Sequence, residues 1–170
     1  MNNIQRISSI VIFLMLLTFS TNVLMPKVSY ERPHIHLIEY ISNKYHKDPK
    51  LIKLIVFEAE KNSNKERFPT LHDTLAIISI ESSFNSTAVS TSGALGLMQI
   101  LYTKTSFEPT ENISHGTILL KEYRDRLATE SDAVQAYNLG IGNFKEGIRN
   151  QKYLHKFKQA KEEIVNADSF

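Results

Sequence analysis

The sequence has no cysteine among its 170 residues, no tryptophan, and few residues that break helices, with 6 glycines and 5 prolines. The absence of cysteine excludes both a disulfide framework and a thiolate metal site. The 6 histidines are scattered, with no H-E-x-x-H or other ligand spacing. A G-x-S-x-G elbow and a phosphate-binding loop are also missing. We therefore predict no metal and no cofactor.

Excess charge of one sign is lacking too. The 20 lysines and arginines nearly balance 18 acidic residues, and the formal net charge is +2. This charge is too small, and too evenly interspersed, to indicate nucleic-acid binding, and it is typical of a solvated surface. No internal repeat or low-complexity tract is present. The length allows one domain with a small appendage and a real core, and we expect a monomer.

The longest apolar run lies at the start of the chain, at residues 10–17, after Arg6. Residues 1–25 are therefore predicted to be a signal peptide, with cleavage after Ser20 and export to the periplasm or cell envelope. An uncleaved N-terminal anchor is the alternative, because no clean A-x-A site follows. The run is, however, short for a membrane-spanning helix.

Residues 30–69 are expected to form a helical appendage. Apolar residues from Ile35 recur at helical spacing and indicate one amphipathic helix. Asp48 and Pro49 then have the pattern of an N-cap followed by a first-turn proline, and they predict a second helix that ends near Asn62. We expect this appendage to pack against the main domain at residues 70–165.

The main domain begins with a mostly apolar helix whose last turn contains Glu81. Aliphatic neighbours and the negative end of the helix dipole both disfavour the ionised carboxylate, so its pKa should be raised. A raised pKa is what a general acid near neutral pH requires. The alternative interpretation is an ordinary glutamate that faces water at a helix end.

A polar loop rich in serine and threonine follows Glu81, and it leads to a glycine-spaced stretch at residues 93–100. Gly93 and Gly96 are three positions apart. We expect this stretch to be a short, tight helix in which the two glycines share a face and allow close backbone approach.

Three short motifs follow one another in a fixed order: E-S-x-F at residues 81–84, G-L-M-Q at 96–99 and A-Y-N at 136–138. Together they resemble the soluble (SLT) type of lytic transglycosylase, over roughly residues 70–150. The resemblance implies an all-α, lysozyme-like catalytic domain. It also implies that the substrate is the glycan strand of peptidoglycan, which agrees with the expected export.

The resemblance also implies roles for individual residues. Glu81 should protonate the glycosidic oxygen of the bond between N-acetylmuramic acid and N-acetylglucosamine, and then deprotonate the muramic 6-hydroxyl. The product is 1,6-anhydromuramic acid, formed without water. Ser90 and Gln99 should hydrogen-bond sugar and Met98 should line the cleft. Tyr137 should hold the Glu81 carboxyl, and Asn138 should brace the adjacent wall.

Two other functions fit the same motifs. One is a muramidase that uses water, as goose-type lysozymes do. The other is a peptidoglycan-binding assembly factor without turnover, although the intact Glu81 argues against it. A cell-envelope secretion or pilus apparatus is a further candidate partner. Ordinary glycoside hydrolysis uses two carboxylates, and the matched motifs supply only Glu81.

Overall fold

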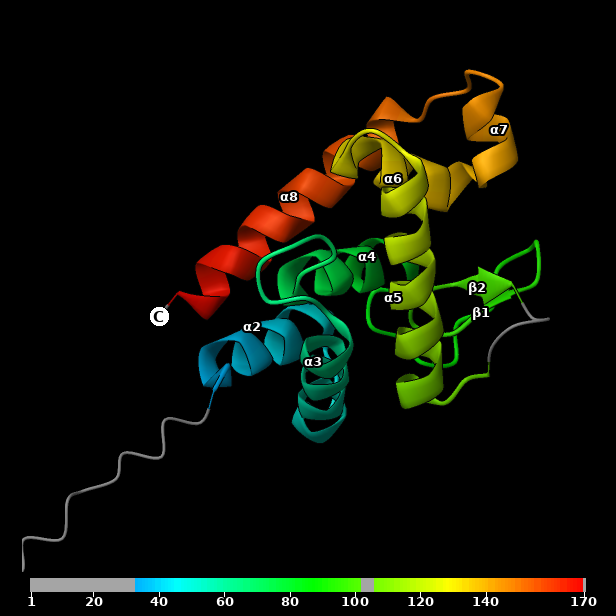
Figure 1. The fold of residues 1–170 in the computed structure, drawn as a ribbon. Helices are drawn as coiled ribbons and strands as arrows, with labels where there is room; N and C mark the ends of the chain where they lie inside the picture. The colour runs from blue at the N-terminus through cyan, green and yellow to red at the C-terminus, as the bar shows by residue number, and fades with distance from the viewer. Residues whose placement is uncertain (1–32, 102–105, 170) are drawn as a thin grey trace, which may run out of the picture. The chain divides into compact units, whose positions relative to one another are not determined.

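The computed structural model describes residues 33–101 and 106–169. Within these ranges it contains seven helices and two short strands, so the expected mainly α architecture is confirmed (Figure 1). The helices in this part of the chain are too short or too polar to cross a membrane. The predicted signal peptide or anchor at residues 1–25 lies outside the described residues.

The first two described helices lie where the sequence predicts two helices. Helix α2 spans Ile35–Tyr45 and helix α3 spans Pro49–Asn62. The Asp48 side chain accepts a hydrogen bond from the Lys50 N–H, and Pro49 follows in the first turn, as predicted. Both helices contribute fully buried side chains to the same hydrophobic core as the later helices.

Helix α4, Leu71–Ser82, is the buried helix that carries Glu81. A capping box begins it, because the Thr70 hydroxyl accepts from the Asp73 N–H while the Asp73 carboxylate accepts from the Thr70 N–H. Every residue from Asp73 to Ser79 is buried. The helix ends at Ser83, whose backbone is left-handed with φ 51°, so Glu81 lies in the last turn.

The stretch at residues 93–100 is not the helix that its glycine spacing predicted. It forms strand β1 (Ala94–Leu95), a turn, and strand β2 (Ile100–Leu101), which pair antiparallel. Gly96 has φ 76°, and a Cβ there would lie 2.5 Å from Asn112 Nδ2. A side chain is therefore excluded by both the backbone angle and the close neighbour. The glycine serves a tight turn rather than a helix face.

The remaining helices are α5 (Pro109–Arg126), α6 (Glu130–Leu139), α7 (Ile141–Lys145) and α8 (Gln151–Asp168). The Asn112 side chain, near the start of α5, is fully buried beneath the β1–β2 turn. It accepts from the Met98 N–H at 2.8 Å and donates to the Leu95 carbonyl at 3.0 Å. One amide side chain therefore ties the turn to α5.

Helix α8 runs antiparallel along α4 and is joined to it at three levels. Tyr153 at the start of α8 meets Glu81 at the end of α4, and Asp168 at the end of α8 meets His72 at the start of α4. Between them, Lys161 Nζ lies 2.7 Å from the buried Asp73 carboxylate, as an ion pair rather than an aligned hydrogen bond. These contacts fix the position of α8 relative to α4.

Candidate active site

A cleft of about 520 Å³ opens at the end of helix α4. Its volume lies within the range of small-ligand sites. Segments far apart in the sequence form it: the end of α4, the loop before β1, strand β2, α5 and α6. The residues that line it are Glu81, Ser90, Ser92, Ala94, Gln99, Ile100, Leu101, Leu119, Tyr123, Tyr137, Asn138, Leu139 and Gly140.

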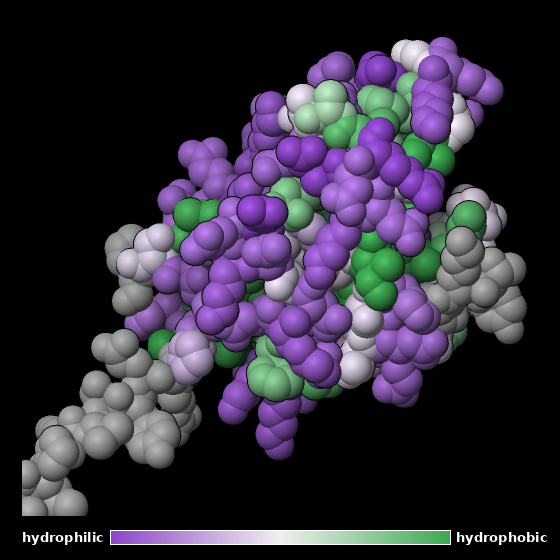
Figure 2. Space-filling model, viewed as in Figure 1, coloured by the Kyte–Doolittle hydropathy of each residue, from purple (hydrophilic) through white to green (hydrophobic). Residues whose placement is uncertain are grey.

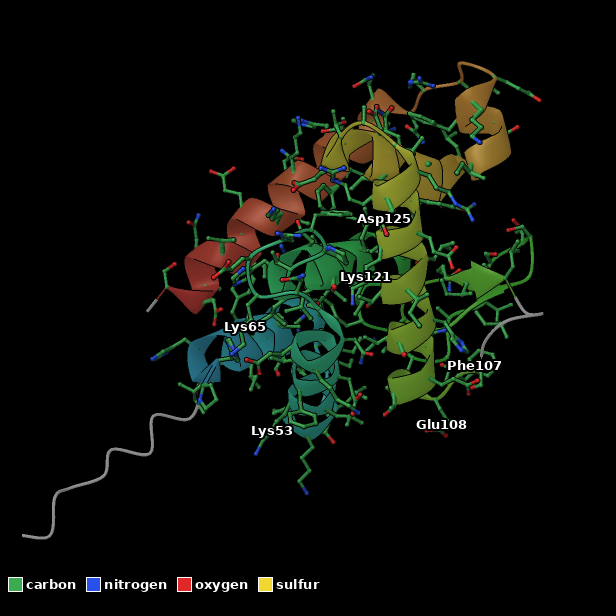
Figure 3. All side chains as sticks on the ribbon, viewed as in Figure 1. Lys53, Lys65, Phe107, Glu108, Lys121 and Asp125 are labelled. Atoms are coloured by element: carbon green, nitrogen blue, oxygen red, sulfur yellow. The ribbon has the colours of Figure 1, made fainter. Side chains whose placement is uncertain are left out.

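Among the described residues that line this cleft, Glu81 is the only acidic one. Burial raises the pKa of its carboxyl above the ordinary value of 4.5, and a hydrogen bond from Tyr153 partly opposes that shift. The other carboxylates of the described residues lie outside the lining of this cleft. Asp125 is exposed on α5 and outside the cleft lining (Figure 3). The cleft therefore presents one carboxyl group with a raised pKa to a ligand.

Tyr153, and not Tyr137, holds the Glu81 carboxylate. The Tyr153 hydroxyl donates to Glu81 Oε1 at 2.5 Å, whereas the Tyr137 hydroxyl donates to the Met98 carbonyl at 2.7 Å. The expected role of Tyr137 is thus corrected, although its ring does line the cleft. Tyr153 lies on α8, outside all three motifs. The one feature of the sequence that could have indicated its role is the hydroxyl group, because an aliphatic side chain at this position would also fill the core.

Met98 does not line the cleft, contrary to expectation. Its side chain is fully buried and faces α5 at Gly116, where an added Cβ would lie 2.4 Å from Met98 Sδ. The backbone of Met98, in contrast, supports the site through hydrogen bonds. Its N–H donates to Asn112 and its carbonyl accepts from Tyr137, so the turn that presents Gln99 is fixed from both sides.

Gln99 lies on the cleft wall, as expected, in a left-handed conformation with φ 50°. Its side-chain nitrogen donates to the carbonyls of Gly96 at 2.9 Å and Ala88 at 3.2 Å. Both donors are therefore used within the protein. The group that Gln99 offers a ligand is its amide oxygen, held in a fixed direction by these two bonds.

Ser90 also lies on the wall, and Ser92 joins it there. The Ser90 hydroxyl accepts from the Ala94 N–H at 2.9 Å, and the two serine hydroxyls are 2.9 Å apart. Ser92 was not among the residues predicted for the site. The pair offers hydroxyl groups at the rim, on a loop that is anchored to β1 by the Ser90 backbone and side chain.

Asn138 lines the opposite wall and is hydrogen-bonded to the start of α8. Asn150 Nδ2 donates to Asn138 Oδ1 at 2.7 Å. Asn150 is the N-cap of α8, because its side chain accepts from the Tyr153 N–H at 3.0 Å. Its own N–H donates to the buried Gln135. The helix that contains A-Y-N therefore positions the residue that holds Glu81.

Tyr123 on α5 is a second cleft residue that the motifs did not indicate. Partial burial raises the pKa of its hydroxyl, and a hydrogen bond with the Ile141 backbone opposes that change. Together with Leu119, Leu101 and Leu139 it gives the cleft apolar surface beside its few polar groups. Among the described residues, no group of three or more His, Asp or Glu side chains is arranged to hold a metal ion.

The model of the transglycosylase SLT domain family matches residues 54–160. The chain belongs to this family. A curated relative, the "Transglycosylase" of Enterobacteria phage PRD1, is 33% identical over 87 residues. That match covers 47% of this chain and 33% of the phage protein, so the chain spans about a third of the length of this relative. The matched family region includes Glu81, the cleft walls and Tyr153.

Proposed function

We propose that this SLT domain is a peptidoglycan lytic transglycosylase that cleaves the β-1,4 bond between N-acetylmuramic acid and N-acetylglucosamine. The observation that carries the proposal is the single carboxyl group among the described residues of the cleft, with its pKa raised by burial. A hydrolase of the ordinary kind needs two carboxylates that flank the bond. One acid is sufficient when the substrate supplies the nucleophile.

In the first step, protonated Glu81 donates its proton to the glycosidic oxygen, and the bond to the anomeric carbon of muramic acid breaks. The 2-acetamido group of the same sugar stabilises the positive charge at that carbon. In the second step, the Glu81 carboxylate removes the proton of the muramic 6-hydroxyl, whose oxygen bonds to the anomeric carbon. The product is a 1,6-anhydro sugar, and Glu81 is protonated again.

The surrounding residues support both protonation states. Burial favours the acid before the first step, and the Tyr153 hydroxyl stabilises the carboxylate between the steps. The Gln99 amide oxygen and the serine hydroxyls at the rim are placed to accept or donate hydrogen bonds to sugar. Tyr123 provides an aromatic surface for a sugar ring.

Product analysis in water enriched in oxygen-18 tests this proposal against a muramidase. We expect muropeptides that end in anhydromuramic acid and carry no label, because no water enters the reaction. Labelled reducing ends would establish a water-using muramidase on the same site. The absence of any released fragment from wild-type protein would indicate a binding factor without turnover.

We also propose that the protein acts on the wall from outside the cytoplasm. The support is the apolar run in residues 1–25, preceded by Arg6. Recovery of a chain that begins near residue 21 from the cell envelope is the expected result. Service to a secretion or pilus apparatus is a compatible role, and it is tested by co-purification with such an assembly.

A further inference from the structure

A strongly basic segment lies at the corner where helix α7 leads into helix α8 (Figure 1). Residues 145–158 contain five lysines and arginines and one acidic residue, Glu146. This local excess of four positive charges is larger than the net charge of +2 of the whole chain. We call this segment the basic corner. Its cations are all exposed: Lys145, Arg149, Lys152, Lys156 and Lys158.

The acidic side chains of the protein do not neutralise these lysines. The lysine ion pairs among the described residues are formed by Lys44, Lys61 and Lys161, none of which belongs to the basic corner. Lys152 and Lys156 are four positions apart, so their side chains share the exposed side of α8. The space-filling view is mainly hydrophilic over α7 and the start of α8 (Figure 2). The corner therefore presents positive charge to an approaching partner.

An exposed isoleucine lies among these charges. Among the described residues after position 119, Ile148 is the one large apolar side chain that is exposed, with an exposed fraction of 47%. Arg149 holds the loop that carries it, because its Nη1 donates to the carbonyls of Phe144 at 2.7 Å and Ile148 at 2.8 Å. The same guanidinium lies 3.7 Å from the centre of the Phe144 ring. Ile148 is thus presented to solvent on a fixed loop.

This combination fits the surface of a lipid bilayer that carries negative charge. On such a surface, lysines are attracted to the lipid phosphates while an apolar side chain enters the headgroup region. A protein partner fits less well, because the cores of protein–protein interfaces are depleted of lysine. A purely polar anionic polymer would leave Ile148 without an apolar environment.

We propose that the basic corner docks the protein on an anionic lipid bilayer. The corner adjoins the cleft, since Asn150 within it donates to Asn138 on the cleft wall at 2.7 Å. None of residues 145–158, all of which the structure describes, lines the cleft itself. Docking therefore holds the cleft beside the bilayer without using the substrate site. The inference goes beyond the proposed cleavage and does not depend on it.

The absence of cysteine from the sequence allows a test at one chosen position. The full chain with Ile148→Cys is labelled with an environment-sensitive fluorophore and mixed with vesicles of phosphatidylglycerol and phosphatidylcholine, or of phosphatidylcholine alone. We expect a blue shift of the emission with the anionic vesicles and none with the neutral ones. Salt at 1 M should abolish the shift, because the Debye length falls to about 3 Å. The label reports the corner itself, whatever residues 1–25 do at the membrane.

Paired lysine variants of the labelled protein test the charges. Lys152→Gln with Lys156→Gln should raise the lipid concentration needed for the half-maximal shift about 25-fold. Each lysine contributes about 1 kcal/mol near an anionic surface, and a factor of ten corresponds to about 1.4 kcal/mol. Lys50→Gln with Lys53→Gln, at two exposed positions on α3, removes the same charge and is the matched control. It should change the lipid concentration far less.

Three results would overturn the docking site: no shift with anionic vesicles, an equal shift with neutral vesicles, or an equal effect of the two lysine pairs. A shift caused by lipid-free peptidoglycan or by a purified envelope protein, but not by vesicles, would assign the corner to that partner instead. Glu81→Gln with the same label should give the wild-type shift. Inactive protein that shifts would therefore remove only the enzymatic proposal, and active protein that does not shift would remove only the docking site.

Discussion

The Tyr153 hydroxyl donates to Glu81 Oε1 at 2.5 Å, although 72 positions separate the two residues in the sequence. The tyrosine is 8% exposed and packs within the core, so its hydroxyl approaches the carboxyl from the protein side. The bond fixes the side chain of Glu81 at the end of α4. It also lowers the pKa of a carboxyl that burial would otherwise raise further.

Replacing the proposed catalytic acid should remove activity and preserve the fold. Glu81→Gln keeps the size of the side chain but cannot transfer a proton, so the cleavage rate should fall roughly 10²–10⁴-fold. Release of muropeptides from purified peptidoglycan measures the rate. Glu130→Gln, at an exposed position on α6 outside the cleft, is the matched control and should retain full activity. A Glu81→Gln protein that cleaves at the wild-type rate would mean another residue is the acid.

Tyr153→Phe should change the pH profile more than the stability. Without the hydroxyl, the Glu81 pKa rises further, because the one interaction that lowers it is lost. The alkaline limb of kcat/KM, where the protonated acid disappears, should therefore move to higher pH. The rate should fall because the carboxyl is no longer held. The ring still fills the core, so the free energy of unfolding should decrease by only about 1 kcal/mol.

Tyr137→Phe serves as the comparison for Tyr153→Phe. It removes the bond to the Met98 carbonyl and leaves the Glu81 partner intact. We expect a loss of stability of about 1–2 kcal/mol with little movement of the pH limbs. A shift of the limbs by Tyr137→Phe alone, with Tyr153→Phe unchanged, would reverse the assignment of the two tyrosines.

Asn112→Ala should destabilise the protein strongly, because it removes buried hydrogen bonds. The buried amide satisfies the Met98 N–H and the Leu95 carbonyl, and alanine leaves both without that partner. The free energy of unfolding should fall by roughly 3 kcal/mol. Denaturant unfolding measures it. Asn64→Ala, at an exposed loop position, should cost far less. Similar losses for the two variants would show that the amide does not hold the turn.

Asp168→Asn should lower the free energy of unfolding near neutral pH but not at acidic pH. Burial alone would raise the pKa of this carboxyl, but hydrogen bonds from His34 and His72 lower it below the ordinary 3.8. A lowered native pKa stabilises the fold above the unfolded value, and this contribution is lost as pH falls through the native value. Asparagine should therefore cost about 1 kcal/mol near neutral pH, where solvent screens part of the charge.

The difference in melting temperature between wild type and Asp168→Asn, followed from pH 7 downward, measures this effect. It should shrink as the pH falls below about 4. A difference that stays constant through this range would show that the asparagine acts through packing instead of charge.

The parts of the fold that the sequence predicted are those fixed by local chemistry. Asp48 and Pro49 begin α3 through their own side chains, and α3 ends at Asn62 as predicted. Glu81 is likewise placed by the helix that carries it. In each case the determinant and the structure lie within a few residues of each other.

The parts that could not be predicted depend on distant partners. The spacing of Gly93 and Gly96 is compatible with a helix or a turn, and buried Asn112 on α5 favours the turn. The choice between Tyr137 and Tyr153 as the partner of Glu81 is equally non-local, because it depends on how α8 lies against α4. The local sequence around either tyrosine does not indicate how α8 packs against α4.

The antiparallel contact between α4 and α8 has a consequence for synthesis of the protein. Glu81 emerges from the ribosome long before Tyr153, and the ties at Lys161 and Asp168 come later still. A nascent chain that already contains all three motifs therefore still lacks the hydroxyl that holds its acid. Glu81 gains this hydrogen-bond partner only when α8 docks, so the proposed activity should be reduced in an unfinished chain.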